Sequence, residues 1–170
     1  DDQHLFALSA ESLTHYGDQV PMCCYVGQVL LIVNTAARCG FRPQYADLQA
    51  LQDRFADRGF TVLGFLSNDF ANQGGSRNEA EQCQTEFALT FEQFMHVGVT
   101  PNSSVGQHPV FEWLTSQQGL EGPVSWNFAK FLVSRDGRLL ARWSSIESPM
   151  SAGVLNTIET ALQEDGSAND

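Results

Sequence analysis

Residues 26–45, VGQVLLIVNTAARCGFRPQY, contain the pattern around which the rest of the chain is organised. Its run Val29–Val33 is continuously apolar and rich in β-branched residues, which is typical of a strand buried on both faces of an α/β sheet. Pro43 then suits the first turn of a helix, because apolar residues follow it at helical spacing. The stretch therefore predicts that Cys39 lies between the carboxyl end of a central strand and the amino end of a helix.

This position favours an anion, because the first backbone N–H groups of a helix have no partner within the helix. A cysteine thiolate is such an anion, and Arg38 and Arg42 add positive charge beside Cys39. The thiolate is the form in which cysteine acts as a nucleophile. The alternative is that Cys39 is a small apolar residue packed in a loop.

Three segments of the chain resemble motifs of one known family. The first is similar to VNVASKCGLTPQY of that family and reads LLIVNTAARCGFRPQY at residues 30–45. The second, GFLSNDFANQ at 64–73, resembles GFPCNQFGGQ, and the third, WNFAKFLVSRDG at 126–137, resembles WNFTKFLVDRDG. These are motifs of the glutathione peroxidase family. The resemblance implies a thiol peroxidase that reduces hydrogen peroxide and organic hydroperoxides through the sulfenic acid of Cys39.

The resemblance also implies a catalytic site of four side chains, namely Cys39, Gln73, Trp126 and Asn127. Amide and indole N–H groups can stabilise developing negative charge without titrating. The predicted topology brings the four together, because Cys39 and Gln73 follow parallel strands and the strand after Asn127 should run antiparallel to them. Taken singly, Gln73 would more often be a surface residue, Asn127 a turn residue and Trp126 a core residue.

The segment around Gln73 departs from the family pattern. Ser67 replaces a common Cys, Asp69 replaces a common Gln, and Gly74 and Gly75 replace a common Glu-Pro pair. Because glycine allows many backbone conformations, we expect this loop to be more mobile than in other members of the family.

The chain has four cysteines, and Cys83 lies in a predicted helix after the Gln73 loop. The resolving cysteine of the thioredoxin-dependent members lies in the same helix, one place later in plant sequences. The resemblance thus implies a Cys39–Cys83 disulfide, and the alternative is a buried helical cysteine. Cys23 and Cys24 are adjacent, and because a disulfide between neighbours is strained, we interpret them as thiols without a redox role. The cysteines lack C-x-x-C or zinc-site spacing, so we expect no metal and no bound cofactor.

Composition and charge exclude several classes of protein. A chain of 170 residues with 42% hydrophobic and 17% charged residues is typical of one soluble globular domain, here residues 1–170. Its net charge of −11 argues against binding to nucleic acid. It has no apolar run near the roughly 20 residues that span a membrane.

The net negative charge also affects which reductant can bind. Glutathione carries two carboxylates, and only Arg38, Arg42 and Arg77 lie near the predicted site. We therefore expect thioredoxin or another dithiol protein, in preference to glutathione, to reduce the enzyme.

The remaining patterns predict an α/β, thioredoxin-like fold with a central mixed sheet, helices on both faces and an N-terminal β-hairpin. We expect hairpin strands at 5–8 and 19–22, further strands at 29–33, 60–65, within 91–97, at 127–134 and 138–143, and helices at 43–56, 77–87, 110–117 and 151–162. Residues 164–170 are predicted to be a disordered tail.

Short loops between Asn102 and Trp126 resemble those of the compact family members and predict a monomer or weak dimer. The first residue is Asp1 rather than Met, which slightly favours a periplasmic or secreted protein over a cytoplasmic one. Two other thiol enzymes fit less well, because a peroxiredoxin needs P-x-x-x-[TS]-x-x-C and a disulfide oxidoreductase needs C-x-x-C. The alternative function is a redox sensor or relay that passes oxidation to a partner protein without efficient turnover.

Overall fold

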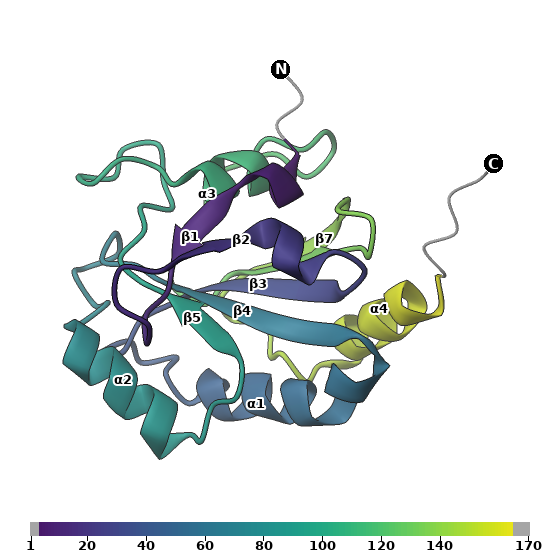
Figure 1. Cartoon of the computed structure of the whole chain (residues 1–170), viewed down its shortest axis with the longest axis horizontal. Coiled ribbons are helices and arrows are strands. Elements are labelled where there is room, and N and C mark those ends of the chain that lie inside the picture. Colours follow the sequence, from purple (N-terminus) through teal and green to yellow (C-terminus); the bar gives the residue numbers. More distant parts are fainter. Residues whose placement is uncertain (1–3, 165–170) are drawn as a thin grey trace.

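The computed structural model describes residues 4–164 and contains a five-stranded sheet and a separate two-stranded sheet (Figure 1). The strands of the larger sheet lie in the order β5-β4-β3-β6-β7. They are β3 (Val29–Thr35), β4 (Phe60–Leu66), β5 (Glu92–Phe94), β6 (Lys130–Val133) and β7 (Leu139–Trp143). β3, β4 and β5 are parallel, whereas β6 runs antiparallel to both β3 and β7. The carboxyl ends of β3 and β4 therefore meet the amino end of β6 at one edge, as predicted.

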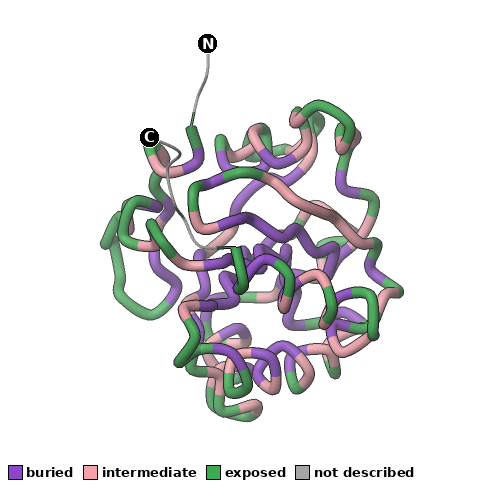
Figure 2. The backbone as a smooth tube through the Cα atoms, turned by 90° about the vertical axis from the view of Figure 1, so that its right-hand side faces the viewer, coloured by how far each residue is buried: buried purple, intermediate pink, exposed green. Residues whose placement is uncertain are grey.

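All seven residues of β3 are buried, because helices cover both faces of the sheet. Leu31 and Val33 face a core shared with α1 (Gln44–Phe55) and α4 (Ala152–Gln163). Leu30 and Ile32 face a second core with α3 (Pro109–Leu114). Figure 2 shows these buried strands inside a more exposed shell. The arrangement confirms the predicted thioredoxin-like fold with a mixed central sheet.

Three of the four helices begin and end within one residue of the predicted positions, whereas α3 ends at Leu114, three residues before the predicted end. Pro43 is the N-cap of α1 rather than its first residue. The hydroxyl of Ser76 caps α2 (Arg77–Glu86), and the hydroxyl of Ser151 caps α4 by accepting from the Val154 N–H. Between residues 4 and 164 the longest helices are too short, and not apolar enough, to cross a membrane.

The N-terminal hairpin is present, but its first strand was predicted in the wrong place. The strands are β1 (Ser9–Glu11) and β2 (Gln19–Pro21), paired antiparallel. Leu5–Ala7 instead form a turn of 3₁₀ helix, because the His4 ring nitrogen accepts from the Phe6 N–H at 3.3 Å and caps it. The expected tail falls almost wholly on residues 165–170, which lie outside the described part of the chain.

The strand predicted at residues 127–134 also needs a correction at its start. β6 begins at Lys130 rather than at Asn127, since residues 126–128 form a turn. Phe128 has a left-handed backbone, φ 62°, and its N–H donates to the Asn34 carbonyl at 2.7 Å. An apolar residue in this conformation is rare, so the strand-like sequence gives no sign of the turn.

Lys130, the only lysine of the chain, is fully buried at the start of β6. Its ammonium donates to the carbonyl oxygens of Ser144 at 3.4 Å, Ser145 at 3.1 Å and Glu147 at 2.6 Å. These contacts hold the connection between β7 and α4 against the sheet. Burial lowers the pKa of Lys130 to about 8, although Glu147 and Asp47 oppose the change.

This lowered pKa predicts that the protein becomes more stable between pH 8 and pH 10. In that window the unfolded chain, in which lysine titrates near about 10.4, binds more protons than the folded one. The free energy of unfolding should therefore rise, by about 2 kcal/mol at pH 10, since each pKa unit is worth about 1.4 kcal/mol. Urea unfolding under reducing conditions at several pH values measures the rise. Lys130→Met should lack it, and the same slope in both proteins would contradict the assignment.

Candidate active site

Cys39 lies in the turn between β3 and α1, as the sequence predicts. Its side chain is 4% exposed and packs in the same core as α1. The Phe41 N–H points at its sulfur, with a nitrogen-to-sulfur distance of 3.4 Å. A backbone donor at this position stabilises a thiolate, because it supplies positive charge without a mobile side chain.

Backbone hydrogen bonds join the loop that carries Gln73 to the turn that carries Cys39. The Arg38 N–H donates to the Gln73 carbonyl at 2.9 Å, and the Ala37 N–H donates to the Gly74 carbonyl at 3.1 Å. Gly74 also packs closely against the backbone that follows β4, because a Cβ there would lie 2.6 Å from the Ser67 carbonyl oxygen. The glycine that replaces a common glutamate thus has a packing role.

Gln73 and Asn127 contact each other through their side chains. The Asn127 amide NH₂ donates to the Gln73 side-chain oxygen at 3.0 Å. The NH₂ group of Gln73 is not used in this contact and can serve another acceptor. Asn127 is fully buried, and its side-chain oxygen has no hydrogen-bond partner. A buried acceptor without a partner is costly, and a bound hydroxyl group would satisfy it.

Trp126 precedes Asn127 in the turn and is half-buried. Its ring packs against the ring of Phe70, with 5.6 Å between centroids, and against the core that contains Cys39. Phe70 belongs to the same loop as Gln73. The structure thus brings together the elements that carry all four predicted residues, with a direct side-chain hydrogen bond between Gln73 and Asn127.

Asn34 is a site residue that the sequence analysis missed. Its NH₂ donates to the Trp126 carbonyl at 2.9 Å, and its side-chain oxygen accepts from the Ala129 N–H at 3.0 Å. Both contacts span the turn that holds Trp126 and Asn127. The sequence shows only that a polar residue, Asn34, ends the apolar run Val29–Val33, and it does not show which residues Asn34 contacts.

Cys83 lies on the buried side of α2 and is 1% exposed. Arg42, in the turn after Cys39, donates from Nε to the Cys83 sulfur at 3.3 Å. The same guanidinium forms an ion pair with Glu86, and these two contacts raise the pKa of Arg42. Arg42 therefore connects the Cys39 turn to the helix that holds the second buried thiol.

A second ion pair joins the same two segments. Arg38 donates from Nε to Glu79 at 2.6 Å and lowers the pKa of that carboxyl to about 2. The positions of Glu79, Cys83 and Glu86 on α2 are spaced so that they share one face of the helix. This face, which we call the cysteine face of α2, is paired with the arginines on either side of Cys39.

Cys23 and Cys24 lie in a 3₁₀ turn, Met22–Tyr25, that precedes β3. Both are exposed free thiols. They precede β3 in the chain, whereas the turn of Cys39 follows it, so the full length of β3 separates the two segments along the chain. Residues 4–164 contain no group of three or more His, Cys, Asp or Glu side chains that could hold a metal ion.

Comparison with known proteins identifies related sequences. The family model of glutathione peroxidase matches residues 5–115. A hydroperoxy fatty acid reductase of Synechocystis sp. is 45% identical over 156 residues, which cover 85% of this chain and 89% of that protein. A glutathione peroxidase-like peroxiredoxin of Saccharomyces cerevisiae is 40% identical over 154 residues, which cover 87% and 91% of the two chains.

Solved structures agree with this result. The crystal structure of Trgpx in apo form superposes with a TM-score of 0.75 at 29% identity, and covers 97% of this chain and 99% of its own. The sequence matches extend well past half of the chain and include the segments of Cys39 and Gln73. The chain therefore belongs to the glutathione peroxidase family.

Proposed function

We propose that this protein is a thiol peroxidase in which Cys39 reduces hydrogen peroxide and organic hydroperoxides. The observation that carries the proposal is a buried cysteine sulfur, faced by the Phe41 N–H at 3.4 Å, at the same sheet edge as the bonded Gln73–Asn127 pair. The thiolate attacks one peroxide oxygen and the O–O bond breaks. The other oxygen takes a proton and leaves as water or an alcohol, and Cys39 becomes a sulfenic acid.

The partly exposed rings beside the site support a preference that extends to organic hydroperoxides. Phe41 and Trp126 pack against the core of Cys39, and Phe70 packs on Trp126. Aromatic surface of this kind can contact the organic part of a hydroperoxide. The hydroperoxy fatty acid reductase among the relatives is consistent with this substrate class.

Gln73 and Asn127 are expected to stabilise the charge on the leaving oxygen. Gln73→Ala should slow the oxidation of Cys39 by about 10-fold to 1,000-fold, the range for losing one preorganised donor. Asn127→Ala should have a similar effect, because it removes the contact that orients Gln73. Stopped-flow mixing of the reduced protein with hydrogen peroxide measures the rate without any reductant.

Two further variants sharpen this experiment. Gln73→Glu keeps the size of the side chain but replaces the NH₂ donor by an anionic oxygen, so it should be at least as slow as Gln73→Ala. Gln82→Ala makes the same truncation at an exposed position of α2 and should retain the wild-type rate. Wild-type rates in both Gln73 variants would show that backbone N–H groups alone stabilise the charge.

We further propose that a dithiol protein such as thioredoxin, rather than glutathione, reduces the oxidised enzyme. Each arginine near the site is paired with a glutamate: Arg38 with Glu79, Arg42 with Glu86, and Arg77 with Glu11 at 3.8 Å. Each of these arginines has an acidic partner, so the site offers little uncompensated positive charge to the two carboxylates of glutathione. A monomer or weak dimer is the expected working form.

The alternative function is a relay that passes oxidation to a partner protein. The same site chemistry would serve it, because the first step is again a sulfenic acid on Cys39. Turnover with excess hydrogen peroxide, thioredoxin and thioredoxin reductase separates the two functions. Many equivalents of peroxide consumed per protein support the peroxidase, whereas consumption that stops after one equivalent supports the relay.

A further inference from the structure

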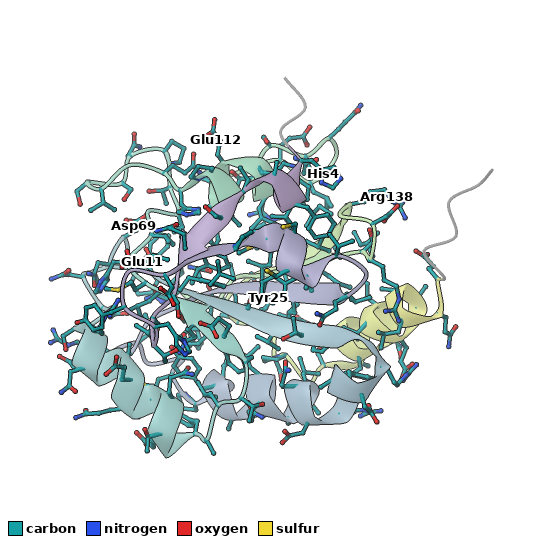
Figure 3. All side chains as sticks on the ribbon, in the orientation of Figure 1. His4, Glu11, Tyr25, Asp69, Glu112 and Arg138 are labelled. Atoms are coloured by element: carbon teal, nitrogen blue, oxygen red, sulfur yellow. The ribbon has the colours of Figure 1, made fainter. Side chains whose placement is uncertain are left out.

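Asp69 lies in the Gln73 loop, and its carboxylate binds a different part of the chain. Oδ2 accepts from the N–H groups of Val99 at 2.6 Å and Thr100 at 3.1 Å, and Oδ1 accepts from the Ser103 hydroxyl at 2.6 Å. Figure 3 shows Asp69 at the left of the molecule, below the loop that leads to α3. Hydrogen bonds to a carboxylate are stronger than those between neutral groups, so this is a firm attachment.

The loop to which Asp69 binds is held in place by contacts of its own. The Val97 N–H donates to the Leu66 carbonyl at 2.9 Å, at the end of β4, and the His108 N–H donates to the Gly98 carbonyl at 2.8 Å. Gly98 also pairs with Gln107 in an isolated β-bridge, and this pairing closes the loop at its base. Asp69 therefore fastens the Gln73 loop to a part of the structure that is itself anchored to the central sheet.

A single tight turn connects Asp69 to Gln73. The Gln73 N–H donates to the Phe70 carbonyl at 3.1 Å, while Ala71 and Asn72 adopt left-handed conformations with φ of 52° and 53°. Non-glycine residues rarely adopt this conformation, and they persist in it only when their surroundings hold them there. The position of the Gln73 amide thus depends on how the start of the turn is held.

We propose that Asp69 is a positioning residue for peroxide reduction and acts through Gln73. The inference rests on the proposed role of Gln73 as a donor to the leaving oxygen. By fixing the start of the turn, Asp69 holds the amide of Gln73 in register with Asn127 and with Cys39. Small displacements of a donor are costly, since an error of about 1 Å can slow a reaction by about 100-fold.

Asp69→Ala and Asp69→Asn distinguish positioning from bulk stability. Alanine leaves the N–H groups of Val99 and Thr100 without an acceptor, so Cys39 oxidation should slow by about 10-fold or more. Asparagine can still accept from both N–H groups and donate to Ser103, so its rate should stay within about threefold of wild type. Stopped-flow oxidation by hydrogen peroxide gives the rates, and thermal unfolding reports on stability. Asp136→Ala, which removes a carboxylate bonded to Ser134 in the distant β6–β7 turn, is the matched control.

A double-mutant cycle with Gln73→Ala decides whether Asp69 acts through Gln73. If it does, Asp69→Ala causes no further loss of rate once Gln73 is absent. Equal losses in both backgrounds, or an unchanged rate in Asp69→Ala, would overturn the inference while leaving the role of Cys39 intact. If Asp69→Ala does not fold, Asp69→Glu, which displaces the carboxylate by one methylene, enters the same cycle and should lose rate only when Gln73 is present.

Discussion

In the Cys39→Ser variant, the rate of peroxide reduction is expected to fall to the background rate. A serine hydroxyl is not ionised at neutral pH, so the Phe41 N–H would face a poor nucleophile. None of the other three thiols can take its place. Cys23 and Cys24 precede β3, whereas Cys39 follows it, and Cys83 lies in α2, outside the turn in which the Phe41 N–H faces a cysteine sulfur. Consumption of one equivalent of hydrogen peroxide by the reduced variant measures the effect.

Matched controls come from the same chain. Cys23→Ser and Cys24→Ser make the same chemical change at exposed positions and should keep the first turnover at the wild-type rate. A dimedone adduct on the peptide that contains Cys39 identifies the oxidised sulfur directly. If Cys39→Ser loses its thiols to peroxide as fast as the wild type does, another cysteine is the nucleophile and the proposed function fails.

The position of Cys39 could be predicted because its neighbourhood is dominated by local sequence patterns. A wholly apolar run such as Val29–Val33 predicts a central strand, and a second run parallel to it places two loops at one edge. The structure confirms both strands and their parallel pairing. Hydrophobic periodicity does not show which side chains in those loops are catalytic. The resemblance to the family motifs indicated them.

Other features could not be read from the sequence, since they depend on contacts between distant residues. Asn34 holds the turn of Trp126 by hydrogen bonds to residues more than 90 positions away. The left-handed Phe128 is stabilised by the same contacts, and this explains why β6 starts later than its apolar pattern predicts. The Asp69 attachment is of the same kind. Such side-chain contacts are decided by tertiary packing, which local propensity does not record.

The glycine pair in the Gln73 loop illustrates the difference. From the sequence, Gly74 and Gly75 predict a mobile loop. In the structure Gly75 has φ 81° and Gly74 touches the Ser67 backbone, so both positions use properties that only glycine has. The Ala37 N–H donates to the Gly74 carbonyl and the Arg38 N–H donates to the Gln73 carbonyl, and these two bonds connect the loop to the Cys39 turn. A flexible residue type here serves one specific conformation.

Cys83→Ser is expected to leave the first oxidation unchanged and to stop turnover with thioredoxin. This prediction follows from the proposal that, in the wild type, the Cys83 thiol condenses with the Cys39 sulfenic acid, which forms a disulfide and releases water. Without Cys83 the sulfenic acid must wait for an external thiol. Turnover should fall by about 100-fold or more, because an intramolecular step becomes a bimolecular one. A coupled assay with thioredoxin and its reductase measures the rate, and the sulfenic acid should persist as a dimedone adduct.

Such a step requires Cys83 to leave its buried position, and α2 has few buried residues that oppose this. Only three of its residues, Arg77, Ala80 and Cys83, are buried. Its ion pairs to Arg38 and Arg42 are solvent-exposed, and water and salt screen such pairs. Segments with few buried apolar contacts open locally far more often than the core does. Local opening of α2 would break the hydrogen bond between Arg42 and the Cys83 sulfur. Arg42 is three residues from Cys39 in the chain, so the released thiol would start close to the Cys39 turn.

Peptide mass analysis after one equivalent of hydrogen peroxide tests the disulfide itself. We expect a Cys39–Cys83 linked peptide in the wild type and in Cys24→Ser, and none in Cys83→Ser. Thioredoxin should then support faster turnover than glutathione in a paired assay, since the arginines around Cys39 are already paired with glutamates. Oxidised protein in which Cys83 still reacts with iodoacetamide, together with a higher rate on glutathione, would show that Cys83 is a core residue. Cys39 would then work alone with small thiols, and the cysteine face of α2 would have a purely structural role.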